Sequence, residues 1–100
     1  MEKLTPHYDL PRIQADVARL GPAAFTKGAL DGGRAMGLTS SEMMAVVASL
    51  TRCNFYKSMT TYADHRVWQD VYHAATPLRR DAYIKLTPRE GAPVIQFKEK

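Results

Sequence analysis

The sequence has a single cysteine, Cys53, so it can form no internal disulfide and lacks the zinc motifs that depend on cysteine pairs. No stretch approaches the roughly 18 consecutive apolar residues that a membrane-spanning helix requires. The residues after Met1 include Glu2 and Lys3 and form no apolar run, which does not fit a secretory signal peptide. We therefore expect a cytoplasmic protein with no membrane partner.

The length and composition of the chain fit one small globular domain spanning positions 1–100. Hydrophobic residues make up 45% of the chain, which is enough for a packed core. The net charge is +4, and the excess lies in the second half: residues 1–50 hold five basic and five acidic residues, whereas residues 51–100 hold nine basic and five acidic ones. Such a one-sided surplus favours an anionic partner, although many basic domains have none.

The first half of the chain has the periodicity of helices. A first helix is expected after Asp9, with Pro11 in its first turn and Gly21-Pro22 at its end. Its inward face holds four apolar residues at helical spacing: Leu10, Ile13, Val17 and Leu20. A weaker helix is expected from Thr26 toward Ala35, because its two internal glycines each cost about 1 kcal/mol relative to alanine. These glycines are Gly32 and Gly33, and Gly37 is expected to end the segment.

A third helix is predicted from a capping box, in which Thr39 is followed three residues later by Glu42. Apolar residues then form a stripe at helical spacing: Met43, Val46, Val47 and Leu50. A methionine-rich stripe of this kind is typical of a core, and we interpret it as core rather than as a cofactor pocket.

The second half alternates β-branched or aromatic residues with polar ones and predicts strands near 57–63, 67–73, 82–87 and 94–98. The breaks between them fall at 64–66, 74–81 and 88–93. Connections this short favour antiparallel neighbours. The expected class is therefore α+β, with N-terminal helices packed on one face of a mostly antiparallel C-terminal sheet.

Alternation along the strands predicts which side chains share a face of the sheet. One face is apolar and should lie against the helices: Ala82, Ile84, Leu86, Ile95 and Phe97. The opposite set is Tyr83, Lys85, Thr87, Val94, Gln96 and Lys98, of which Tyr83, Lys85, Gln96 and Lys98 should face solvent. Lys57, Met59 and Thr61 can join that surface. Strand 67–73 is ambiguous, because Gln69 lies between Val67 and Val71.

An open sheet face with lysines, a tyrosine and glutamines suits single-stranded RNA. Lysines neutralise phosphates, tyrosines offer a stacking surface, and amides can read base edges. An ordinary solvated face, whose charges prevent edge-to-edge aggregation, has the same composition. Residue types alone leave both interpretations open.

Other candidate sites are weaker. No histidine shares a metal-binding spacing with carboxylates, so we expect His7, His65 and His73 to be exposed or satisfied in the core, and we predict no metal site. Asp64 and Asp70 resemble an acid–base pair but fit solvated carboxylates better. Cys53 lacks a neighbouring base, and the glycine pair near position 32 is too short for a phosphate loop.

Residues 54–65, NFYKSMTTYADH, followed by WQDVY at 68–72, resemble the MqsR toxin family. The similarity extends to MEK and TPH at the N-terminus, and to YIK at 83–85 and FKEK at 97–100. The resemblance implies a RelE-like ribonuclease toxin fold and mRNA-interferase activity near GC-containing triplets such as GCU, without a ribosome or a cofactor. It also implies an MqsA-type antitoxin with a zinc-binding N-terminal part and a DNA-binding C-terminal part, so that DNA would be contacted only indirectly.

The resemblance implies roles for individual residues. The matching motif positions assign catalysis to Lys57, Gln69 and Tyr83, with Met59 and Lys98 in support. Together with the polar strand residues, this gives a predicted RNA-binding set of Met59, Lys85, Arg89, Gln96 and Lys98. One departure is that the position of a family histidine in the last strand connection falls here at Glu90, which cannot supply an imidazolium. Arg89 beside it can contact a phosphate instead.

These residues lead to a hypothesis for the reaction. The 2′-hydroxyl of RNA attacks the adjacent phosphate, Lys57 stabilises the negative charge that develops, and Tyr83 hydrogen-bonds the phosphate or relays a proton. Two other classes remain open: a non-catalytic RNA- or ribosome-binding module that uses the same face, and an interaction domain that recruits a partner through a strand edge.

Overall fold

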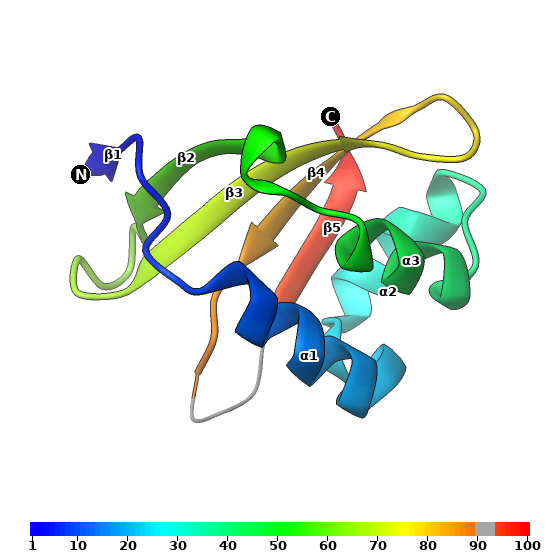
Figure 1. The fold of residues 1–100 in the computed structure, drawn as a ribbon, viewed down its shortest axis with the longest axis horizontal. Coiled ribbons are helices and arrows are strands. Elements are labelled where there is room, and N and C mark those ends of the chain that lie inside the picture. The colour runs from blue at the N-terminus through cyan, green and yellow to red at the C-terminus, as the bar shows by residue number, and fades with distance from the viewer. Residues whose placement is uncertain (90–93) are drawn as a thin grey trace.

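The computed structural model describes residues 1–89 and 94–100 and contains a five-stranded sheet in the order β1-β2-β3-β4-β5 (Figure 1). All neighbouring strands are antiparallel. The strands are β1 (Glu2–Lys3), β2 (Phe55–Thr60), β3 (Trp68–Ala75), β4 (Asp81–Leu86) and β5 (Ile95–Glu99). With helices gathered on one side of this sheet, the chain has the expected α+β class, which is consistent with a RelE-like fold.

Three α-helices lie between β1 and β2: α1 (Leu10–Leu20), α2 (Lys27–Ala35) and α3 (Ser40–Ala48). Two short 3-10 helices, Gly21–Ala24 and Arg52–Asn54, lie in the same part of the chain. The predicted capping box of α3 is confirmed, since Thr39 and Glu42 bond each other's backbone amides. Asp9 occupies the N-cap position of α1, but its side chain accepts no capping bond. Pro11, the second residue of the helix, removes one of the amides that such a cap would use. Among the described residues, no helix is long and apolar enough to cross a membrane.

The core lies between the helices and the apolar face of β3, β4 and β5. The residues predicted to face the helices are all buried, with at most 2% exposure: Ala82, Ile84, Leu86, Ile95 and Phe97. The stripe of α3 packs into the same cluster. Burial of one large apolar side chain contributes about 1.5–3 kcal/mol, so this layer fixes which face of the sheet is turned inward.

The ends of all four predicted strands differ from the observed ones by one to three residues, most of all in β2, which begins at Phe55. β2 ends at Thr60, and Thr61 instead forms a turn in which its hydroxyl bonds the carbonyl oxygen and amide of Asp64. β3 continues to Ala75, because Ala74 and Ala75 pair with Ala82 and Asp81. Alanine has weak strand preference, so cross-strand pairing decides the state of this segment.

β1 has no counterpart among the predicted strands, and a buried carboxylate explains its position. Asp70 on β3 is 0% exposed and accepts hydrogen bonds from the amides of His7 and Tyr8 at 2.9–3.1 Å. The Tyr8 hydroxyl also donates to the carbonyl oxygen of Trp68 at 2.8 Å. These long-range bonds hold the N-terminal segment along β2, where Glu2 pairs with Met59.

The internal glycines of α2 allow this helix to approach its neighbours closely. A Cβ atom at Gly32 would collide with the carbonyl oxygen of Phe97 on β5, and one at Gly33 would collide with the side chain of Met43. The close packing of α2 on β5 and α3 is possible only if these two positions carry no side chain. This packing explains why the helix contains glycine despite its low helix propensity.

Substitution of these glycines should separate packing from helix propensity. Gly32→Ala should lower the free energy of unfolding by about 1–3 kcal/mol, because the added methyl group forces α2 away from β5. Gly28→Ala in the same helix meets no atom closer than 4.0 Å and should be neutral or stabilising by up to about 1 kcal/mol. Urea denaturation of both variants provides the test. A stabilised Gly32→Ala protein would contradict the close contact.

Candidate nucleic-acid interface

The candidate site is the sheet face opposite the helices, hereafter the polar face. Cross-strand pairing aligns one row of side chains across β2 to β5, and a second row beside it across β3 to β5. The first row is Lys57, Val71, Lys85 and Gln96, and the second is His73, Tyr83 and Lys98. The predicted cations, tyrosine and amide from three separate strands therefore share one surface.

β3 resolves the ambiguity about Gln69. Asp70 and Tyr72 are buried on the helix side, so alternation turns Gln69 and Val71 to the polar face. The Gln69 amide nitrogen donates to the Thr87 hydroxyl at 3.1 Å, and Met59 is the cross-strand neighbour of Gln69 on β2. Thr87 itself is buried, with 3% exposure. The bond to Thr87 thus holds the Gln69 amide in place on the polar face.

Lys57 forms an ion pair that the sequence did not predict. Its ammonium group lies 2.7 Å from the Glu2 carboxylate, and its side chain is 23% exposed. The hydrogen bond to Lys57 lowers the pKa of Glu2, and the same bond raises the pKa of Lys57. Lys57 therefore remains a cation at neutral pH, and its ammonium group is held by a carboxylate from β1.

Positive charge is concentrated around Tyr83. The ammonium groups of Lys98 and Lys85 lie 5.3 and 5.8 Å from the centre of its ring. Burial lowers the pKa of Lys85, and repulsion from Lys98 and Lys57 lowers it further. Lysines this close repel one another, and an anion placed among them would relieve that repulsion.

Two hollows border these residues. One, of about 330 Å³, lies between α2 and β5; it is lined on the sheet side by Tyr83, Lys85, Gln96 and Lys98. The other, of about 310 Å³, is lined by Gln69, Thr87, Arg89, Val94 and Gln96. Arg89 is exposed beside Gln69, as a phosphate contact requires. Glu90, the position of the family histidine, lies outside the described residues.

Three residues of this surface were not predicted from the sequence to belong to it: Glu2, Tyr56 and His73. Extending the alternation of β3 by two residues from Val71 would have placed His73 on the polar face. His73 is neither exposed nor satisfied in the core, since its Nε2 atom is buried without a hydrogen-bond partner among the described residues. No local pattern marks Glu2, because its pairing with Lys57 spans 55 positions.

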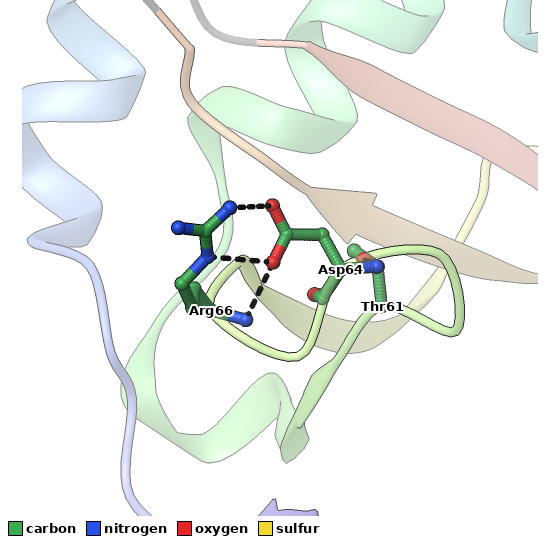
Figure 2. A network of polar contacts seen from close by, with 3 residues as sticks. All are labelled: Thr61, Asp64 and Arg66. Atoms are coloured by element: carbon green, nitrogen blue, oxygen red, sulfur yellow. Dashed lines mark hydrogen bonds and ion pairs between the residues drawn. The ribbon is translucent and has the colours of Figure 1, made fainter.

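The weaker candidates remain apart. The Asp64 carboxylate accepts hydrogen bonds from the amide and guanidinium of Arg66, as Figure 2 shows, whereas Asp70 is buried on the helix side. The two carboxylates therefore do not form an acid–base pair. Cys53 is exposed in a short turn before β2. Among the described residues, no group of three or more potential metal ligands occurs.

The fold and the polar face define a class: small basic α+β proteins whose cationic, tyrosine-bearing sheet face matches a single-stranded nucleic acid. A family model described as "Motility quorum-sensing regulator, toxin of MqsA" matches residues 5–99. The chain is also 38% identical over 100 residues to a protein of Escherichia coli (strain K12) named "mRNA interferase toxin MqsR", and the match covers all of both chains. The chain belongs to the MqsR toxin family.

The ion pair between Glu2 and Lys57 predicts a specific titration. Glu2 should lose its proton below its ordinary pKa of 4.5, and Lys57→Met should raise the pKa of Glu2 toward that value. Any stability from the lowered carboxyl pKa is present above the ordinary value and disappears as pH falls through the lowered one. Carboxyl chemical shifts measured by NMR across acidic pH test this expectation.

Asp64 provides the control for this titration. The side-chain hydrogen bond from Arg66 also lowers its pKa, and Lys57 is not among the causes of that shift. The Asp64 pKa should therefore stay unchanged in Lys57→Met. An unchanged Glu2 pKa in that variant would mean that the ion pair does not persist in solution.

Proposed function

We propose that the chain is the toxin of a type II toxin–antitoxin pair that cleaves single-stranded mRNA in the cytoplasm, as an endoribonuclease that needs neither ribosome nor metal ion. The observation that supports it most is the shared surface of Lys57 and Tyr83, which lie on different strands with Lys85 beside them. Family membership and the name of the relative, an mRNA interferase toxin, support the same activity.

The proposed reaction uses a nucleophile that RNA itself carries. The 2′-hydroxyl attacks the adjacent phosphorus atom and loses its proton, and the bond from phosphorus to the 5′-oxygen breaks as that oxygen gains a proton. The products are a 2′,3′-cyclic phosphate and a 5′-hydroxyl. The protein has to align these atoms and stabilise the charge that develops on the phosphate oxygens, which fixed cations do well.

Each side chain then has a role that its position supports. Lys57 stabilises the pentacoordinate phosphorane, while Glu2 keeps the ammonium group in place until a phosphate competes for it. Tyr83 hydrogen-bonds the phosphate or relays a proton, helped by the lysines near its ring. Gln69 orients the phosphate or reads a base. The remaining predicted contacts hold flanking nucleotides: Met59, Lys85, Arg89, Gln96 and Lys98.

The partners follow from the family. A toxin requires an antitoxin, and we propose that it is of the MqsA type, with a zinc-binding N-terminal part and a DNA-binding C-terminal part. The toxin would then contact DNA only through that partner. Cleavage near GC-containing triplets such as GCU is part of the same proposal.

Sequencing of RNA ends after incubation with the purified protein tests the reaction and the triplet together. Cyclic-phosphate ends at recurring GC-containing triplets, produced equally in the presence of EDTA, are expected. Loss of cleavage in EDTA would refute the metal-independent reaction. RNA that is bound but never cut would favour the alternative, a non-catalytic RNA- or ribosome-binding module that uses the same face.

Lys57→Met should reduce the rate of cleavage by about 100-fold or more, because the substitution removes the cation that faces the developing charge. The methionine keeps the length of the lysine stem, so the thermal unfolding temperature should change little. Arg19→Ala removes a positive charge from α1, away from the polar face, and serves as the matched control. Cleavage by Lys57→Met at the wild-type rate would refute the catalytic role of Lys57.

Lys85→Ala should act mainly on RNA affinity. Each phosphate contact made by a cation contributes about 0.7 to the slope of log K against log salt for a single strand. The variant should therefore show a shallower salt dependence, with its largest loss of affinity at low salt. Fluorescence anisotropy over a salt series measures the slope, and a slope equal to that of the wild type would exclude the contact.

A further inference from the structure

Tyr56 reaches the polar face through an irregularity in β2. Phe55 pairs with Tyr72 and Lys57 pairs with Val71, so Tyr56 is an extra residue, a β-bulge, between the two pairs. Phe55 packs against Tyr72 in the core, while the Tyr56 ring lies against His73. The bulge thus brings Tyr56 and Lys57, adjacent in the sequence, to the same surface.

The Tyr56 ring is supported on one side and open on the other. Its centre lies 4.3 Å from that of His73 with 23° between the planes, and His73 lies 5.4 Å from Tyr83. Tyr56 nevertheless remains 50% exposed. Because one ring face is covered by His73, much of this exposure belongs to the other face and the edges. An aromatic ring that is already fixed and has an open face can stack against a flat ligand group with little loss of its own side-chain entropy.

His73 is suited to supporting this ring. Burial lowers its pKa, repulsion from Lys100 lowers it further, and Asp81 acts weakly in the opposite direction. The imidazole is therefore neutral at neutral pH and adds no charge beside the lysines. Its buried Nε2 is not accessible to a ligand, so the contribution of His73 here is the flat surface beneath Tyr56.

The charges around the rings match one chemical class of ligand. The Lys57 ammonium lies 5.6 Å from the centre of the Tyr56 ring, and those of Lys85 and Lys98 lie at similar distances from Tyr83. Ammonium groups that track a phosphate backbone, next to aromatic rings that receive bases, are the combination by which proteins hold single-stranded nucleic acids.

We propose that the open face of Tyr56, backed by His73, is a stacking subsite for the nucleobase next to the phosphodiester that Lys57 contacts. The subsite rests on the proposed ribonuclease function and deepens it, since a base held there fixes the register of the strand. Stacking accepts any base, so the subsite positions the RNA more than it selects a sequence.

The test pairs a protein variant with a modified RNA. The probe is a short RNA that contains a mapped cleavage site, with a 2′-deoxy residue that prevents cutting; a second version lacks the base next to that site. Tyr56→Leu should bind the complete probe about tenfold more weakly than the wild type, whereas Tyr56→Phe should stay within about twofold. Removal of the base should weaken binding to the wild type but cause no further loss in Tyr56→Leu.

Two controls distinguish stacking on Tyr56 from a general effect of removing a surface ring or of unfolding. Tyr62 is fully exposed in the β2–β3 connection, and Tyr62→Leu should leave probe affinity unchanged. The base-deletion experiment on the wild-type protein and the Tyr56→Phe variant needs no disruptive substitution, so it remains informative if Tyr56→Leu is unstable. Base deletions at every nucleotide that leave wild-type affinity intact would overturn the subsite.

Failure of the stacking subsite can be distinguished from failure of the proposed ribonuclease function. A wild-type protein that cuts RNA, together with a Tyr56→Leu variant that binds the probe normally, would refute the subsite alone. A wild-type protein that never cuts RNA would refute the ribonuclease and provide no mapped site, so a short single-stranded RNA with a base deletion at each nucleotide in turn would then be the probe. Binding of that RNA with the expected dependence on Tyr56 and on one base would support the subsite. Normal probe binding with lost antitoxin binding in Tyr56→Leu would assign the ring to a protein partner and overturn the proposal.

Discussion

The polar face depends on the pleat of β3, the central strand of the sheet. Asp70 and Tyr72 are buried toward the helices, so Gln69, Val71 and His73 must go to the other side. A shift of one residue in the register would exchange the two sets and bury the wrong one. The carboxylate of Asp70, bound by two backbone amides, adds a second penalty, because a slipped strand would leave buried polar groups without partners.

The same carboxylate connects the core to the polar face. By holding the amides of His7 and Tyr8, Asp70 fixes the segment that leads back to β1, and β1 places Glu2 against Lys57. A residue buried on one side of the sheet therefore positions an ion pair on the other. The ammonium group of Lys57 is held before any ligand arrives, which reduces the reorganisation that binding requires.

The charge on the polar face is kept at a cost in stability. Lys85 loses hydration and is repelled by Lys98 and Lys57. Val71, which lies on β3 between Lys57 and Lys85, is completely buried on this face. His73 likewise keeps a buried nitrogen without a partner among the described residues. Lysines that repel one another and a buried polar atom without a partner are energetically unfavourable. Such features, when they are concentrated on one surface above a well-packed core, are typical of surfaces that bind ligands.

Local sequence patterns were enough to predict the helices, the α+β class and the facing of β4 and β5, because capping boxes and apolar periodicity act within a few residues. The sequence also singled out Lys57, Gln69 and Tyr83 through a resemblance. Three features became visible only once the chain was folded: the facing of Gln69, the close contact that Gly32 permits and the position of Glu2 beside Lys57. Each of these depends on strand register, on a bulge or on contacts between distant segments, and local patterns do not encode them.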